Sequence, residues 1–462
     1  MLTALAIFSA ARHVGAVTSP PRTGPRPTGR LTVTALDRDV GSTIPFRAVF
    51  LSVGARAAPP KVRDSEGEFS ILLPRGRYRV VVFHGLEWTA DQREIEIDGT
   101  EQRLTFGLRH VVEPGGWSST DLHVHARASF DSLVSFETRE RSLSALGIES
   151  AVLSDHDAVG APSPRATLGW IGGVEITRKF GHLNAYPYTV EPPPKQLRKL
   201  QEIVTFVREK APHAILQVNH PRLRGMGLFT LLGITPRKES TLMRLPTQVH
   251  HLEVFNGHDT RAATVRAVVD EWLQLWQAGR PLWATGGSDV HKTTKPSPGL
   301  PRTYVECAPV PSRATCATPL WVRNMLAAGR AFVTSGPLVE LTQGGRGPGS
   351  PLVVKDGRAL FHVRVRAAPY VAADELLVLV GGREITRREL RRRQLSLDAT
   401  GTLEEARQSA ELFDGDIEVP VDVDAKTLVV LVRGRQNLRT LLPTVDMEPF
   451  AFSNPLVIGA TP

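Results

Sequence analysis

The stretch that decides the fold is Asp121-Leu122-His123-Val124-His125, which places two histidines one residue apart on an apolar, extended segment. Alternate side chains of a strand point to the same side, so both imidazoles can reach one metal ion. Imidazole combined with carboxylates suits zinc, manganese or iron. Five further segments carry histidine or acid, each after an apolar run and before a Gly, Pro or polar loop: SDHD (154–157), GVE (173–175), GHL (181–183), NHP (219–221) and SDVH (288–291). Together the six segments predict a metal site.

The spacing of apolar side chains differs between the part of the chain that contains these segments and the parts on either side of it. Residues 30–112 and 337–462 alternate apolar and polar side chains between turns, which is typical of half-buried strands. Residues 117–335 alternate short apolar strands with amphipathic helices, the pattern of β/α units. Strand ends converge on one face of a β/α barrel, so the six segments are expected to meet there. The sequence thus predicts a multidomain α/β plus β protein, with a barrel at 113–336 between two small β-sandwich domains.

Composition narrows the classes of partner. The net charge is +9 and comes mainly from arginine. The densest cluster, at 387–393, lacks interleaved aromatic residues, so we interpret it as a solvated face in a helix or loop, not as a nucleic-acid site. No stretch reaches the roughly 18 apolar residues of a membrane-spanning helix. We therefore expect a small-molecule substrate, no stable nucleic-acid partner and no transmembrane segment.

Two features bear on the compartment. Residues 1–29 begin with MLTALAIFSAARHVGAVTS and continue as a Pro/Arg/Gly-rich linker. They are either a secretory signal without its basic start or a disordered tail, and the first interpretation places the protein in the periplasm or outside the cell. The only cysteines are Cys307 and Cys316. They either close one short loop in an oxidising compartment or remain two free thiols.

At this point a family resemblance becomes visible. The segments DLHVHARASFDS, VLSDHDAVG, GVEITRKFGHLNAYP, VNHPR, EVFNG and GGSDVHK resemble the PHP metallohydrolases, named for polymerase and histidinol phosphatase. They are most similar to the branch of carbaryl-type carbamate hydrolases, the CehA/McbA-like group, as are GRAFVTSGP and PFAFSNP. The resemblance implies a distorted (β/α)7 PHP barrel with two or three divalent ions. The flanking sandwiches look carboxypeptidase-regulatory- or transthyretin-like at 30–112 and immunoglobulin-like at 337–462.

Carried over position by position, the resemblance implies nine metal ligands. Glu175 would bridge two ions, because a carboxylate has two oxygens. Asp131 stands where some members of the family have histidine, and together with His182 it would decide whether a third ion binds. Asp155 is placed as a hydrogen-bond acceptor behind the adjoining ligand. The nine are His123, His125, Asp131, His156, Glu175, His182, His220, Asp289 and His291.

The chemistry expected of such a site is hydrolysis. Two divalent cations about 3.5–4 Å apart lower the pKa of a bridging water toward 7 and polarise the scissile bond. We assign catalytic roles to Asp289, as the acceptor of the proton from that water, and to Glu175 and Asp155. Asn256 and His258 are expected to contact substrate, with ordinary loop hydrogen bonding as the alternative.

The segment between His220 and His250 is long for a barrel loop and rich in apolar side chains. It either walls a pocket for an aromatic or lipophilic group or forms one inward-packed barrel helix.

Three functions remain open. The first is cleavage of a carbamate, ester or amide. The second is a phosphoesterase acting on a phosphomonoester or oligonucleotide, which calls for basic side chains near the ligands. The third is an inactive binding or scaffold protein, which retention of all nine ligand types argues against. The basic side chains near the ligands in sequence are Arg127, Arg178, Lys179, Arg222 and Lys292.

Overall fold

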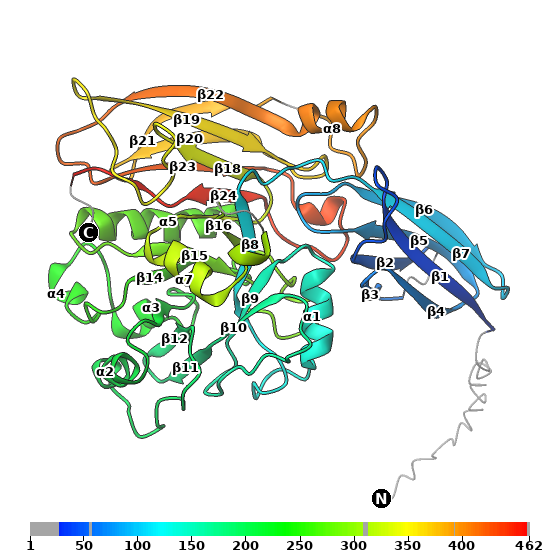
Figure 1. Ribbon diagram of the computed structural model, residues 1–462, viewed down its shortest axis with the longest axis horizontal. Coiled ribbons are helices and arrows are strands. Elements are labelled where there is room, and N and C mark those ends of the chain that lie inside the picture. Colours follow the sequence, from blue (N-terminus) through cyan, green and yellow to red (C-terminus); the bar gives the residue numbers. More distant parts are fainter. Residues whose placement is uncertain (1–26, 55–57, 308–312, 392, 460–462) are drawn as a thin grey trace, which may run out of the picture.

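The computed structural model describes residues 27–54, 58–307, 313–391 and 393–459. Its strands and helices form three regions in chain order (Figure 1). The amino-terminal strands lie at one end of the molecule, the carboxyl-terminal strands lie along one long side, and the region between them holds most of the helices. The signal-like or disordered segment proposed for 1–29 falls outside the described residues, except for its last three positions.

The amino-terminal region is a sandwich of two sheets. Its strands are β1 (Thr28–Asp37), β2 (Phe46–Ser52), β3 (Lys61–Ser65), β4 (Glu68–Pro74), β5 (Gly76–Phe83), β6 (Ala90–Ile97) and β7 (Gln102–Leu108). One sheet has the order β4-β1-β7 and the other β3-β2-β5-β6. Alternate side chains of β1, among them Leu31 and Val33, meet Phe46 and Val80 of the facing sheet in one apolar core. The period-two pattern therefore found a β-structure correctly.

The central region alternates strands with helices for most of its length. Its elements are β8 (Trp117–Val124), α1 (Phe136–Ser144), β9 (Ser150–Leu153), β10 (Gly169–Gly172), β11 (Val174–Arg178), β12 (Gly181–Tyr186), α2 (Leu200–Lys210), β13 (Ile215–Val218), α3 (Leu228–Leu232), α4 (Glu239–Leu242), β14 (His251–Asn256), α5 (Ala262–Gln277), β15 (Trp283–Gly287), β16 (Arg302–Glu306), α6 (Arg313–Cys316), α7 (Pro319–Ala327) and β17 (Ala331–Thr334). Trp272 and Trp276 of α5 are buried and donate to the same carbonyl, that of Leu282.

The strands of this region are divided between two sheets. The order β11-β12-β13-β14-β15 makes one sheet, in which β13, β14 and β15 are parallel and β11 and β12 form an antiparallel hairpin. The strands β8, β9 and β10 are parallel to one another in a second, larger sheet. A regular barrel of seven β/α units is therefore not shown, because a hairpin replaces one crossover and the strands are divided between two sheets.

The carboxyl-terminal region continues the larger sheet. Its elements are β18 (Leu338–Thr342), β19 (Arg358–Arg366), β20 (Glu375–Val380), β21 (Arg383–Glu389), α8 (Leu403–Ala410), β22 (Glu411–Pro420), β23 (Thr427–Arg433), the 3-10 turn η1 (Leu438–Thr440), β24 (Phe450–Ser453) and β25 (Leu456–Val457). The larger sheet runs β10-β9-β8-β16-β17-β24-β23-β20-β21, and β18-β19-β22 forms a separate sheet. One sheet thus crosses the boundary expected at 336/337, through the pairing of β17 with β24.

Three further expectations from the sequence can be compared with the structure. Cys307 and Cys316 are joined by a disulfide, with their Cα atoms 5.4 Å apart. Arg387 lies on strand β21, so the expectation of a helix or loop at the start of the arginine cluster was wrong; its guanidinium pairs with Glu384 at 2.8 Å. Arg393 donates to the carbonyl of Ala367 at 2.9 Å. None of the helices in the described part of the chain is long and apolar enough to cross a membrane.

Candidate metal centre

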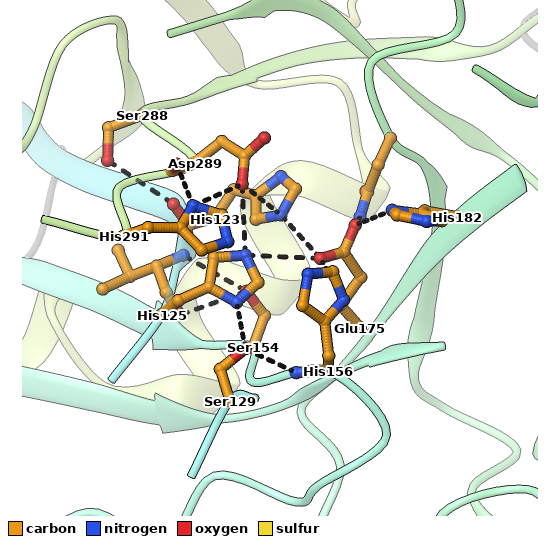
Figure 2. Close-up of polar contacts among 12 residues, drawn as sticks. His123, His125, Ser129, Ser154, His156, Glu175, His182, Ser288, Asp289 and His291 are labelled. Carbon is orange, nitrogen blue, oxygen red and sulfur yellow. Dashed lines mark hydrogen bonds and ion pairs between the residues drawn. The ribbon is translucent and has the colours of Figure 1, made fainter. Parts of the chain in front are cut away.

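The ends of the central strands bring the predicted ligands together. His123 lies near the end of strand β8, His125 follows that strand directly, and Asp289 follows β15. Because β13, β14 and β15 are parallel, their carboxyl ends meet at one edge, and His220 follows β13 there. Figure 2 shows the imidazoles and carboxylates from these elements pointing toward one another. Their convergence follows from strand direction and not from proximity in the sequence.

Glu175 of β11 lies at the centre of the cluster and is fully buried. Its Oε2 is 3.3 Å from Nε2 of His123 and 3.3 Å from Nε2 of His125. Its Oε1 is 3.0 Å from Nδ1 of His182 and 3.4 Å from Nε2 of His220. Oε2 also lies 3.1 Å from Nδ1 of His156. One oxygen of this carboxylate therefore faces three imidazoles and the other faces two, which is the arrangement expected of a bridging ligand.

Asp289 contacts the same nitrogens of His123 and His125 as Glu175 does. Its Oδ1 is 3.1 Å from Nε2 of His125 and 3.3 Å from Nε2 of His123. Its Oδ2 accepts a hydrogen bond from Nδ2 of Asn256 at 3.3 Å and lies 3.5 Å from Nε2 of His258. Asp289 thus faces the cluster with one oxygen and a more exposed histidine with the other.

Asp131, His156 and His291 form the outer part of the cluster. Oδ2 of Asp131 is 3.2 Å from Nε2 of His156 and 3.1 Å from Nε2 of His291. Its other oxygen accepts a hydrogen bond from the Ser129 hydroxyl at 2.8 Å. The Asp131 side chain is about a third exposed, unlike Glu175. This part of the cluster therefore borders solvent.

These side chains fit divalent cations in number and kind. Three overlapping groups each bring one ligand atom per residue within 4.8 Å of the others: His123, His125, Glu175 and Asp289; His156, Glu175 and His182; and His125, Asp131, His156 and His291. Nε2 of His123, Oε2 of Glu175 and Nε2 of His291 are buried without a hydrogen-bond partner among the described residues. Buried polar atoms normally have a partner. Neutral imidazole and carboxylate donors suit zinc, manganese or iron.

Two of the strand ends have unusual backbone. His220 and Asp289 have φ values of 27° and 52°, in the left-handed region that residues other than glycine seldom adopt. The amide of His220 donates to Oε2 of Glu253 at 2.7 Å, and that of Asp289 to the carbonyl of His123 at 2.8 Å. Such conformations cost about 1–3 kcal/mol and concentrate at functional sites.

Two buried carboxylates that sequence reasoning left without a role hold the ligands in place. Glu253 of β14 accepts a hydrogen bond from Nδ1 of His123 at 2.9 Å, which leaves Nε2 of that ring facing the cluster. Asp121 of β8 accepts from the amides of Ser288, at 2.9 Å, and Gly299, at 3.0 Å. Glu253 is an acid between apolar residues, Leu252 and Val254, of the buried strand β14, and this is the signal that could have identified it.

The other predicted catalytic and substrate residues have distinct surroundings. Asp155 is buried, and its Oδ1 accepts from the amide of Ala126 at 2.7 Å, directly after the His123–His125 pair. Asn256 is buried and donates to both Glu253 and Asp289, so its amide is engaged inside the protein. His258 is the exception, since its side chain is 43% exposed.

The histidines and carboxylates of the cluster shift one another's pKa values. Burial lowers the pKa of His125, but hydrogen bonds to Asp289 and Glu175 outweigh it and raise the value to about 9. Burial raises the pKa of Glu175, yet the charge of His123 and the surrounding hydrogen bonds hold it well below its ordinary value. Burial and the charge of His125 lower the pKa of His291 to about 4. Protons and divalent cations therefore compete for the same ligand atoms.

The long segment after His220 differs from one of the two alternatives, the single barrel helix. It contains two short helices, α3 and α4, and not one barrel helix. Phe229 of α3 is buried, whereas Met226 and Leu231 are each 42% exposed. Phe130, on the β8–α1 connection, is 79% exposed and stacks on His156 with ring centroids 4.9 Å apart. An exposed aromatic ring therefore lies directly beside a candidate ligand.

Comparisons with known proteins are distant. No family model and no curated protein matches the chain. A two-domain protein from Bacteroides vulgatus that contains a predicted PHP-like metal-dependent phosphoesterase is 15% identical over 69% of this chain and 91% of that chain, at a TM-score of 0.37. A β-glucuronidase from Parabacteroides merdae is 10% identical over 91% of this chain and 60% of that chain, at a TM-score of 0.17. At these values neither likeness establishes a fold, a family or a function for this chain.

Proposed function

We propose that this protein is a metal-dependent hydrolase whose nine ligands hold two or three divalent cations. The observation that carries the proposal is the position of Glu175, buried with His123 and His125 at one oxygen and with His182 and His220 at the other. A carboxylate so placed would hold two ions together. An inactive scaffold has no need to bury this many charged and titratable groups around it.

We also propose that the central region is a distorted PHP barrel, as the sequence motifs imply, between two sandwich domains. Two isolated parallel bridges support this. One joins Val124, the last residue of β8, to Val290, after β15, and the other joins His156, after β9, to Glu175 of β11. They connect the two sheets on both sides of the cluster.

The proposed chemistry divides between the ions and the chain. Bound cations lower the pKa of a coordinated water toward 7 and polarise a carbonyl or phosphoryl oxygen. Asp289 accepts the proton of the attacking water, because its carboxylate lies at the cluster and is ionised: His123 and His125 hold its pKa well below the ordinary value against the opposing effect of burial. His258, 3.5 Å from Oδ2 of Asp289 and part-exposed, is placed to pass a proton between Asp289 and solvent or leaving group.

A carbonyl-centred substrate, a carbamate, ester or amide, fits the surroundings best. Two of the basic side chains that a phosphate would need are already engaged: Arg178 pairs with Asp157 at 2.7 Å, and Arg222 forms an ion pair with Glu271. Phe130 offers an apolar face beside the ligands. Within the PHP metallohydrolases this favours the carbaryl-type branch over the phosphoesterases.

A substrate panel tests the proposal. Metal content of the purified protein is measured together with hydrolysis of 1-naphthyl N-methylcarbamate, 1-naphthyl acetate, p-nitrophenyl phosphate and bis-p-nitrophenyl phosphate. We expect two to three equivalents of metal and faster turnover of the naphthyl compounds. Turnover of the phosphates alone would replace the carbonyl assignment with a phosphoesterase. If no metal binds when cations are supplied in excess, the proposal of a metal-dependent hydrolase is wrong.

A further inference from the structure

A cavity lies at the other end of the strands that carry the metal ligands. Ile215, His251 and Trp283 line it, and each is the first residue of its strand, β13, β14 or β15. The three strands are parallel, so their carboxyl ends are at the metal cluster. A strand of four to six residues spans about 13–20 Å. The cavity, of about 560 Å³, is therefore separate from the metal centre.

The ionisable side chains that line this cavity are all basic. Arg208, Arg280 and Arg323 all line it, together with His213 and His250, and none of the described residues that line it is Asp or Glu. Burial and the charge of Arg323 lower the pKa of Arg208. Burial lowers the pKa of His250 as well, and the charges of Arg208 and Arg280 add to the effect. These groups act on one another as uncompensated positive charges.

The arginines are held in position by backbone carbonyls and not by carboxylates. Arg208 donates to the carbonyls of Ala214, at 2.6 Å, and Gln248, at 2.5 Å. Arg323 donates through Nε to the carbonyl of His213 at 3.0 Å, and Arg280 to that of Leu245 at 3.2 Å. Carbonyl partners fix the orientation of a guanidinium without removing its charge. The three cations are thus rigidly placed around one space.

One buried donor at the cavity also lacks a partner. Nε of Arg280 is buried without a hydrogen-bond partner among the described residues. Burying an unpaired donor costs free energy, so such groups normally indicate a missing partner.

We propose that this cavity is a binding site for an oxyanion, a phosphate or carboxylate group of a small molecule. Arginine presents several N–H donors in a plane and binds such groups with two hydrogen bonds at once. The space lies within the range of small-ligand pockets, roughly 300–1,000 Å³. The site is independent of the proposed hydrolase activity, because none of its residues belongs to the metal cluster.

Sulfate serves as the probe, because it is a tetrahedral dianion that the proposed hydrolase does not cleave. Binding to the metal-loaded protein is measured by calorimetry at constant ionic strength, with chloride as the balancing anion. We expect saturable binding of one equivalent at the cavity. Arg323→Gln and Arg280→Gln should each weaken it about tenfold or more, the usual scale for losing a charge-assisted hydrogen bond.

Two control variants locate the bound anion. Arg103→Gln removes an exposed arginine of β7 and should leave sulfate affinity unchanged. Glu175→Gln alters the metal cluster and should also leave it unchanged. If Arg103→Gln weakens binding as much as the cavity variants do, the attraction comes only from net charge and the proposal is wrong. Loss of binding in Glu175→Gln assigns the anion to the metal centre and overturns it too. Arg323→Lys, which keeps the charge, tests the site if Arg280→Gln does not fold, and should bind more tightly than Arg323→Gln.

Discussion

At the scale of single residues, some side chains of the metal cluster belong to more than one candidate ion group. Glu175 belongs to two of the three candidate ion groups, as do His125 and His156. A shared carboxylate cannot be replaced by water without losing charge at both ions, whereas a terminal imidazole can often be. The consequences of substitution should therefore be unequal among ligands of the same site.

Glu175→Gln should remove at least one full equivalent of metal and nearly all hydrolysis. The change deletes a negative charge from the carboxylate that faces imidazoles with both oxygens. Metal content by plasma mass spectrometry and kcat measure the effect. Glu191→Gln, at an exposed glutamate paired with Lys210, is the matched control and should change neither. Full metal and activity in Glu175→Gln would rule out the bridged site.

Asp289→Asn should instead keep much of its metal and lose turnover by about 10²–10⁴-fold, the scale of a positioned proton acceptor. The amide keeps one oxygen toward His125 but cannot accept the proton. Metal content and kcat measured on the same preparation separate the two effects. Equal loss of both would make Asp289 a ligand only.

Metal binding should release protons at pH 7. The pKa of His125 is raised to about 9, and that of His123 is raised well above its ordinary value, because the surrounding carboxylates outweigh the opposing effect of burial. Both rings are therefore protonated at pH 7 before a cation displaces the protons, and metal affinity rises with pH until the pKa of His125 is passed. Calorimetry in buffers of different ionisation enthalpy should detect release of about one to two protons. Binding without proton release at pH 7 would contradict these raised pKa values.

At the scale of strands and helices, the sequence predicted the alternation and the strand ends but not the sheet connections. Apolar runs identify β13 and β15, because each is buried on both faces. The antiparallel hairpin of β11 and β12 has no comparable signal, since parallel and antiparallel strands share the same side-chain period. Glu253 was missed for a related reason: its role depends on His123, which lies 130 positions away.

The junction of β8 with the end of β15 gives a prediction at this scale. Asp121 accepts hydrogen bonds from the amides of Ser288 and Gly299 and from the Ser288 hydroxyl, and so fastens the two strands that carry His123 and Asp289. Asp121→Asn replaces one acceptor oxygen with a donor, which then faces other donors. We expect a loss of about 1–3 kcal/mol in the free energy of unfolding, measured by urea titration, together with weaker metal binding. Unchanged metal affinity in a destabilised variant would limit Asp121 to a stabilising role.

At the scale of the whole molecule, the three regions are linked by a shared sheet and by side-chain hydrogen bonds. The boundary expected at 336/337 could not be located from the local pattern, because β17 pairs with β24 more than a hundred residues later. Side chains of the amino-terminal sandwich also contact the central region: Glu87 accepts from the hydroxyl of Tyr304 at 3.0 Å, and Glu66 accepts from that of Ser144 at 3.0 Å. The sandwich is therefore positioned to influence the metal centre, although it contributes none of the nine predicted ligands.

Arg47 provides the test of that influence. It is fully buried on β2, pairs with Asp64 at 2.7 Å and donates to the carbonyl of Thr293 at 2.8 Å, two residues beyond His291. Arg47→Met leaves Asp64 buried without its partner, which should cost about 3–5 kcal/mol of stability. It also removes a hydrogen bond from the backbone that follows His291. A metal ion held by the outer part of the cluster, Asp131, His156 and His291, should therefore bind more weakly; this ion is called the outermost metal equivalent below. Metal titration and thermal unfolding measure the two effects.

The double variant Arg47→Met, Asp64→Leu separates stability from metal binding. Replacing both members of a buried ion pair by apolar residues is often neutral for stability, but it does not restore the hydrogen bond to the Thr293 carbonyl. The double variant should therefore recover most of the thermal stability and still bind the outermost metal equivalent more weakly than the unaltered protein. Recovery of both would mean that the sandwich stabilises the chain without shaping the site. Recovery of stability alone would show that a side chain of the amino-terminal domain positions a ligand of the metal centre. This role would explain why the sandwich packs directly against the region that carries the ligands.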